Sequence, residues 1–207
     1  MEPMNRGFTI IELLVTLAIF IVMTSFTVAK FGNFNQSTLL TDTAYDIALV
    51  VRLAQTYGLS VKNSSQIGAQ NFNLPYGVDF DMSGDSCGGA TSNPTLLTLF
   101  ADLNQTGQSA GMCDASDQSV NTYVITRGAK ISSLCIGADA TACHQSSNSV
   151  SRLDVSFQRP NPEAVICASN GGAPTCNYAY SEATIQGTDG STRTIVVRQN
   201  GQISVQH

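Results

Sequence analysis

The feature that most constrains this chain is an apolar run near its N-terminus, from Phe8 to Ala29, in which Glu12 is the only charged residue. As an α-helix, which rises about 1.5 Å per residue, the run would be ~33 Å long and long enough to cross a hydrocarbon core ~30 Å thick. Its apolarity is continuous around all faces, which disfavours a helix of a soluble domain. We therefore expect a membrane-spanning helix at residues 8–29.

Two other interpretations of the run fit less well. A secretory signal peptide has a shorter apolar region of about 7–15 residues and an Ala-x-Ala-like exit, and this sequence shows neither clearly. A plain membrane anchor explains the length but not Glu12, because an ionisable group inside a membrane segment is costly and is usually retained for a purpose. Arg6 precedes the run, which favours a cytoplasmic N-terminus.

The rest of the chain is polar but weakly charged. Charged residues make up 12% of the sequence, against about 25% in typical soluble proteins. The net charge is −5 and the Lys and Arg residues are scattered singly, so nucleic-acid binding gets no electrostatic support. All six cysteines follow residue 80, a distribution that indicates disulfides formed outside the reducing cytoplasm.

A second helical segment should continue the first. Apolar or small residues recur at intervals of three and four, the pattern of a helix docked on a core: Leu40, Ala44, Ile47, Val51, Ala54 and Gly58. This spacing predicts one helix from Phe8 to about Tyr57, with residues 30–58 as its amphipathic continuation and Gly58 at its end. Gly32 is a candidate for a kink or local melting.

Residues 59–207 read as a β-rich globular domain. Strands are predicted at 76–80, 96–100, 122–126 and 153–157. The C-terminus predicts a three-stranded meander from residues 184–188, 191–199 and 202–206, with tight turns at Asp189-Gly190 and Asn200-Gly201.

The cysteines allow fifteen connectivities, and chain closure favours the local ones. Each local bond would stabilise the domain by roughly 2–4 kcal/mol if unstrained. The expected pairs are Cys135 with Cys143, Cys167 with Cys176, and Cys87 with Cys113.

Candidate metal and catalytic residues are few. Three polar residues stand at alternating positions, as the oxygen ligands of a calcium loop do: Asp102, Asn104 and Thr106. Cys113, however, occupies the position where such a loop has its closing glutamate. An ordinary polar turn is therefore favoured over a calcium site, and no cofactor is expected. His144 and His207 are the only histidines and lie in no recognisable arrangement with a nucleophile. We therefore expect no enzymatic activity.

The residues around the start of the apolar run, Arg6-Gly7-Phe8-Thr9-Ile10-Ile11-Glu12-Leu13-Leu14-Val15, resemble the leader junction of type IV prepilins and of type II secretion pseudopilins. The resemblance implies a leader at residues 1–7, cleavage by a prepilin peptidase between Gly7 and Phe8, and N-methylation of Phe8. Glu12 would then be the fifth mature residue. A lone carboxylate among packed apolar helices needs a partner, and the amino terminus of a neighbouring subunit's Phe8 can supply it.

The resemblance also implies an α+β, pilin-like fold, in which a long N-terminal helix precedes an antiparallel β-rich globule. The expected function is that of a minor pilin in a type IV pilus or related filament. A type II secretion pseudopilin, H-type minor pseudopilins included, and a tip subunit that binds surfaces or DNA are the alternatives. Expected partners are other pilin subunits, the prepilin peptidase, an inner-membrane assembly platform and, before assembly, the membrane. The chain would span the inner membrane once and later join an extracellular or periplasmic filament.

Overall fold

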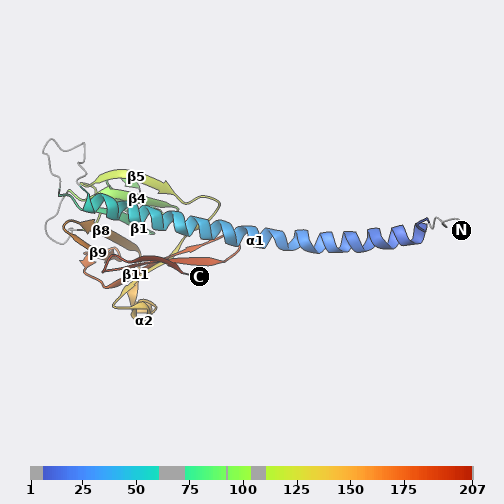
Figure 1. Cartoon of the computed structure of the whole chain (residues 1–207). Helices are drawn as coiled ribbons and strands as arrows, with labels where there is room; N and C mark the ends of the chain where they lie inside the picture. Colours follow the sequence, from blue (N-terminus) through green and yellow to red (C-terminus); the bar gives the residue numbers. More distant parts are fainter. Residues whose placement is uncertain (1–6, 61–72, 92, 104–110, 207) are drawn as a thin grey trace.

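One long helix, α1 (Ile10–Leu59), projects from a β-rich globule and then lies along it (Figure 1). The computed structural model describes residues 7–60, 73–91, 93–103 and 111–206, with no side chains described for 29–35. The helix begins and ends two residues later than the predicted Phe8 and Tyr57. Its backbone stays helical across Gly32, so the local melting considered there does not occur.

The predicted apolar face of the second half of α1 is the face that packs on the globule. Leu40, Ala44, Ile47, Val51 and Ala54 are all buried, which confirms the spacing of three and four.

Gly58 has a different role from the one predicted, because the helix continues past it to Leu59 and is capped at Ser60. A Cβ atom at Gly58 would collide with the backbone carbonyl of Phe157. Glycine is therefore required by the close approach of α1 to a strand rather than by the helix end.

The globule consists of two antiparallel sheets and a short ribbon. The six-stranded sheet has the order β10 (Thr175–Cys176), β9 (Asn161–Ser169), β8 (Arg152–Gln158), β1 (Tyr76–Asp81), β4 (Leu96–Ala101), β5 (Gln118–Val124). The five-stranded sheet has the order β13 (Ile203–Gln206), β12 (Thr192–Arg198), β11 (Tyr180–Gln186), β6 (Lys130–Gly137), β7 (Ser149–Val150). The ribbon pairs β2 (Ser86–Cys87) with β3 (Ala90–Thr91). Two further short helices, α2 (Ala140–Cys143) and the 3-10 turn η2 (Ser146–Asn148), follow β6.

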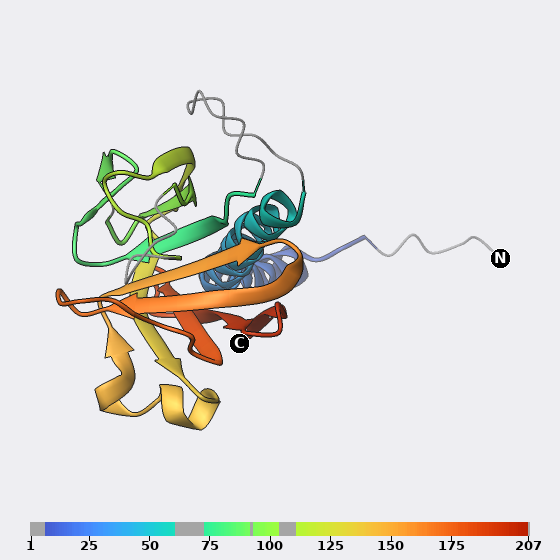
Figure 2. The ribbon, with the colours of Figure 1, turned by 90° about the vertical axis from the view of Figure 1, so that its left-hand side faces the viewer.

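The main core forms where α1 meets both sheets (Figure 2). Side chains such as Ile47 from the helix, Phe80 and Val155 from the six-stranded sheet, and Ile185 and Ile195 from the five-stranded sheet belong to one buried cluster. The second half of α1 is thus an integral layer of the domain. The fold is α+β, with an apolar N-terminal helix followed by an antiparallel β-rich domain.

The predicted strands are all present, with shifted ends. The C-terminal meander is β11, β12 and β13, and Gly190 and Gly201 take the positive φ angles, 81° and 82°, that its turns need. The first meander strand begins at Tyr180 rather than at Thr184. β5 was predicted at 122–126 but occupies Gln118–Val124.

Candidate functional site

The candidate functional segment is the exposed start of α1, and Thr9 defines where it begins. Thr9 is the N-cap residue, and its side-chain oxygen accepts a hydrogen bond from the Glu12 backbone N–H at 3.4 Å. Thr9 and Glu12 have the spacing of a capping box, a threonine followed three residues later by glutamate. Glu12 lies in the first helical turn, where a carboxylate also interacts favourably with the helix dipole. This local role of Glu12 was missed from the sequence, although the spacing alone indicates it.

The apolar half of α1 has no protein around it. Residues Ile10–Val28 have a mean hydropathy of 2.3, and none of that window is buried in the globule. By length and composition this one helix, within the part of the chain that the structure describes, can cross a membrane. Phe8 is 75% exposed at its start. Gly7 has no neighbouring side chain or backbone within contact distance of a Cβ position. The Gly7–Phe8 bond, where cleavage was predicted, is therefore sterically open, and the cleavage itself stays a prediction.

Three disulfides fasten the globule, and they join the same pairs that chain closure favoured. They are Cys87–Cys113, Cys135–Cys143 and Cys167–Cys176. The second pair closes the α2 excursion and the third fastens β10 to β9.

A buried ionic cluster, which was not predicted from the sequence, lies on the face of the six-stranded sheet that carries Asp79. Arg152 Nε lies 2.9 Å from Asp79 Oδ1 and 3.4 Å from Asp154 Oδ2. Both carboxyl groups are fully buried. The Arg152 guanidinium also donates to the backbone carbonyl of Cys113, whose N–H donates to Asp154 Oδ2 at 3.2 Å. The Cys87–Cys113 disulfide thus holds a covering segment over the cluster.

Asp79 and Asp154 are direct cross-strand neighbours, so their buried carboxyl groups lie close together. Burial raises the pKa of Asp154 well above its usual range, the Asp79 carboxylate raises it further, and Arg152 opposes both. Asp154 Oδ1 has no donor facing it among the described residues. Protonation of Asp154 lowers the number of buried negative charges beside Arg152.

The calcium candidates fall only partly within the described residues. Asn104 and Thr106 lie outside them. Asp102 is buried and its Oδ2 accepts a hydrogen bond from the Gly111 N–H at 2.7 Å. Nearby, burial raises the pKa of Asp117 to about 6, against the opposing effect of N–H donors from Asp114 and Leu103. Calcium binding at Asp102, the less favoured alternative to an ordinary polar turn, stays untested.

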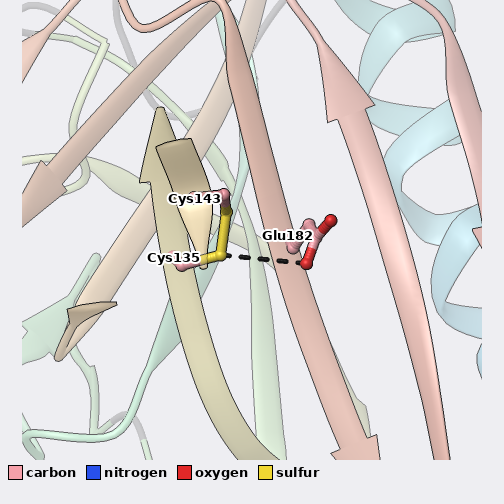
Figure 3. A group of neighbouring side chains, drawn as sticks. All are labelled: Cys135, Cys143 and Glu182. Atoms are coloured by element: carbon pink, nitrogen blue, oxygen red, sulfur yellow. Dashed lines mark hydrogen bonds between the residues drawn. A yellow bond between two sulfur atoms is a disulfide. The ribbon is translucent and has the colours of Figure 1, made fainter. Parts of the chain in front are cut away.

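A cluster near α2 combines sulfur, carboxylate and imidazole. Ligand atoms of Cys135, Cys143 and Glu182 lie within 4.8 Å of one another, with Cys135 Sγ 3.8 Å from Glu182 Oε2 (Figure 3). Both sulfurs are joined in a disulfide, so neither is a thiolate that could bind a metal ion. Buried Glu182 instead accepts from the Tyr180 hydroxyl and lies 2.9 Å from the Nε2 atom of the exposed His144. These contacts fix the α2 segment on the sheet.

Comparison with known proteins identifies the N-terminal segment. Residues 3–28 match the family model described as the prokaryotic N-terminal methylation motif. No curated protein and no solved structure matches the chain. The match covers the leader junction and the exposed half of α1, and it supports the resemblance to type IV prepilins. Proteins with this motif are structural subunits rather than enzymes, and the motif implies processing by a prepilin peptidase and assembly with other pilin subunits.

Proposed function

We propose that this type IV pilin-like subunit is a minor pilin, built into a type IV pilus or a related filament after cleavage between Gly7 and Phe8. In the membrane, lipid covers the exposed half of α1. After cleavage, the apolar helices of neighbouring subunits replace the lipid, and Glu12 pairs with the methylated amine of a neighbouring Phe8. An inner-membrane assembly platform transfers the subunit from one environment to the other.

The observation that carries this proposal is the exposure of the first half of α1. Large side chains along it, among them Ile10, Phe20, Val22 and Phe26, are more than half exposed. Burying each such side chain is worth roughly 1.5–3 kcal/mol, so the helix requires an apolar environment that its own globule does not supply. Because α1 continues without a break into the core, a force on the apolar half is transmitted directly to the folded domain.

A pseudopilin of type II secretion is the alternative within the same fold, and the geometry of a single subunit suits both filaments. The two are separated by location, because a pilus subunit is recovered with filaments sheared from the cell surface. A pseudopilin remains in the envelope, and its deletion blocks protein export.

The test is intact mass spectrometry of the protein purified from its own membranes and filaments. We expect a chain that begins at Phe8 and carries one added methyl group. Gly7→Val should block cleavage, because a branched side chain replaces the residue with the least bulk at the bond that a protease must grip. Gly172→Val is the matched control, since Gly172 also has open space around it. A mature N-terminus at Met1 or after Ala29 would refute the proposal.

A further inference from the structure

A groove lies in the globule where the two sheets meet, and it has no part in the proposed assembly. It comprises two hollows of about 360 and 340 Å³, and Ile136, Asn148 and Tyr178 line both of them. Each volume lies within the range of small-molecule sites, about 300–1,000 Å³. The lining comes from β6 and η2 on one side and from the β9–β10 region on the other.

The lining of this groove is uncharged. Buried apolar side chains, Ile136, Val150 and Ala168, contribute to it. Its polar members are all amides or hydroxyls: Asn148, Asn170, Asn177, Ser147, Ser169, Thr175 and Tyr178. Among the residues that line the two hollows, all of them described, there is no Asp, Glu, Lys, Arg or His. A charged ligand would lose hydration there without gaining a partner, whereas a neutral ligand with many hydroxyl groups would find both donors and acceptors.

Asn177 is the lining residue with the most unused hydrogen-bonding capacity. The side-chain amide of Asn148 donates to the Ala142 carbonyl at 2.7 Å, and that of Asn170 donates to the Ser149 carbonyl at 3.0 Å, so these two shape the walls. The exposed Asn177 side chain makes no hydrogen bond to another described residue. It therefore offers two donors and one acceptor at the groove.

Both walls are held in place before any ligand arrives. The Cys135–Cys143 disulfide anchors the β6 side and the Cys167–Cys176 disulfide anchors the β9–β10 side. The Tyr178 hydroxyl lies 2.5 Å from the Thr175 hydroxyl, which fixes the side chain that both hollows share. Rigid walls reduce the entropy lost on binding, so a shallow site can still retain a ligand.

From this lining we propose that the groove binds a neutral saccharide. Sugar rings present hydroxyl groups to amides and hydroxyls, and their C–H faces pack on apolar surface such as Ile136 and the Tyr178 ring. The α2 region, which borders one hollow, lies on the other side of the globule from α1 in both views (Figures 1 and 2). If subunits pack through α1, as proposed above, the groove still faces outward.

The test uses the full chain in a zwitterionic detergent, because sugar-headed detergents would compete for the groove. The probes are an array of neutral oligosaccharides of glucose, mannose, galactose and N-acetylglucosamine, with polysaccharide-derived and glycoprotein-derived sets printed separately. Sialylated and sulfated oligosaccharides and short peptides are printed alongside. We expect the neutral oligosaccharides alone to be retained, and the set that binds identifies the source of the sugar.

Two variants locate the binding. Asn177→Gly removes the amide but keeps a residue that tolerates the φ angle of 71°, and it should weaken binding about tenfold. Ala173→Glu places a charged side chain at an exposed position that lines one hollow and should abolish binding. Asn121→Ala is the control, on β5 at the opposite edge of the six-stranded sheet from β10.

Three results would each overturn the proposal. The protein retains no neutral oligosaccharide, it prefers sialylated oligosaccharides or peptides, or the wild type and all variants bind the neutral oligosaccharides equally. Leader cleavage and filament incorporation of Asn177→Gly should equal those of the wild type, so a failure of saccharide binding is distinguishable from a failure of the assembly proposal.

Discussion

The substitution Asp154→Asn should remove a pH dependence of stability that the buried ionic cluster creates. With Asp79 and Asp154 both ionised, two buried carboxylates would face a single Arg152, whereas protonation of Asp154 leaves Asp79 as the ion-pair partner of Arg152. Burial and Asp79 together raise the pKa of Asp154 well above its usual range. The folded protein therefore retains a proton that the unfolded chain releases near pH 3.9.

The sign of the effect follows from that difference. The stability due to the bound proton is complete below the pKa of the unfolded chain and is lost as the pH rises toward the folded pKa of Asp154. Between the two values the folded state binds one more proton, so this group lowers the folding equilibrium constant about tenfold per pH unit. Asparagine has nearly the same shape, and its amide can donate to Asp79 at any pH. The stability difference, variant minus wild type, should grow across this window and then become constant.

The measurement is urea unfolding of the oxidised full chain in detergent from pH 4 to pH 9, followed by tyrosine fluorescence. Asp189→Asn serves as the control, because Asp189 is an exposed turn residue whose pKa is lowered by hydrogen bonds from Ser191. It stays ionised throughout this range, so its variant should run parallel to the wild type. A difference between Asp154→Asn and the wild type that does not change with pH would refute the retention of a proton on Asp154.

Glu12→Val should leave membrane insertion and unfolding of the globule unchanged but reduce the protein in sheared filaments, because the unpaired Phe8 amine then costs roughly 3–5 kcal/mol. Equal incorporation of the two proteins would contradict the role of Glu12 in register. Gly58→Ala should lower the free energy of unfolding by roughly 1–3 kcal/mol in the same urea experiment, since its Cβ meets the immobile carbonyl of Phe157. Gly172→Ala is the control and should leave the free energy of unfolding unchanged, because Gly172 has open space around it. If Gly58→Ala is as stable as the wild type, α1 can shift away from β8 and the predicted collision is wrong.

The parts of the fold that the sequence predicted are those governed by local periodicity. Every third or fourth residue of α1 from Leu40 to Ala54 is buried because a single stripe faces the core. The meander was recognisable because Asx-Gly turns separate its strands. By contrast, β9 opens with Asn161-Pro162-Glu163, a polar and proline-containing stretch typical of a loop, and only its later residues are buried. In β6, Ser132 and Ser133 interrupt the apolar alternation.

The ionic cluster was missed because burial on that face is created by tertiary structure. Asp79 and Asp154 occupy alternating positions in their strands, where a charged residue ordinarily indicates a face in contact with water. Here the segment around Cys113 covers this face, and the Cys87–Cys113 disulfide holds it there. Which segment covers a sheet depends on contacts far apart in the chain, and no local pattern records them.

The magnitudes at Glu12 decide which of its two roles explains a carboxylate in an apolar helix. Its position in the first turn, after the Thr9 cap, gains about 0.3–1 kcal/mol from the helix dipole. Placing an acidic side chain in hydrocarbon costs about 2.5–3.5 kcal/mol on insertion scales when it lies at the helix centre, and less near an end. Capping also needs only the Thr9 oxygen, which already accepts the Glu12 N–H. The local role thus offsets a fraction of the cost, and the cationic partner that we propose from another subunit would offset the remainder. Because α1 is continuous from that carboxylate to the core, a pair formed at Glu12 would set the axial position of the whole globule.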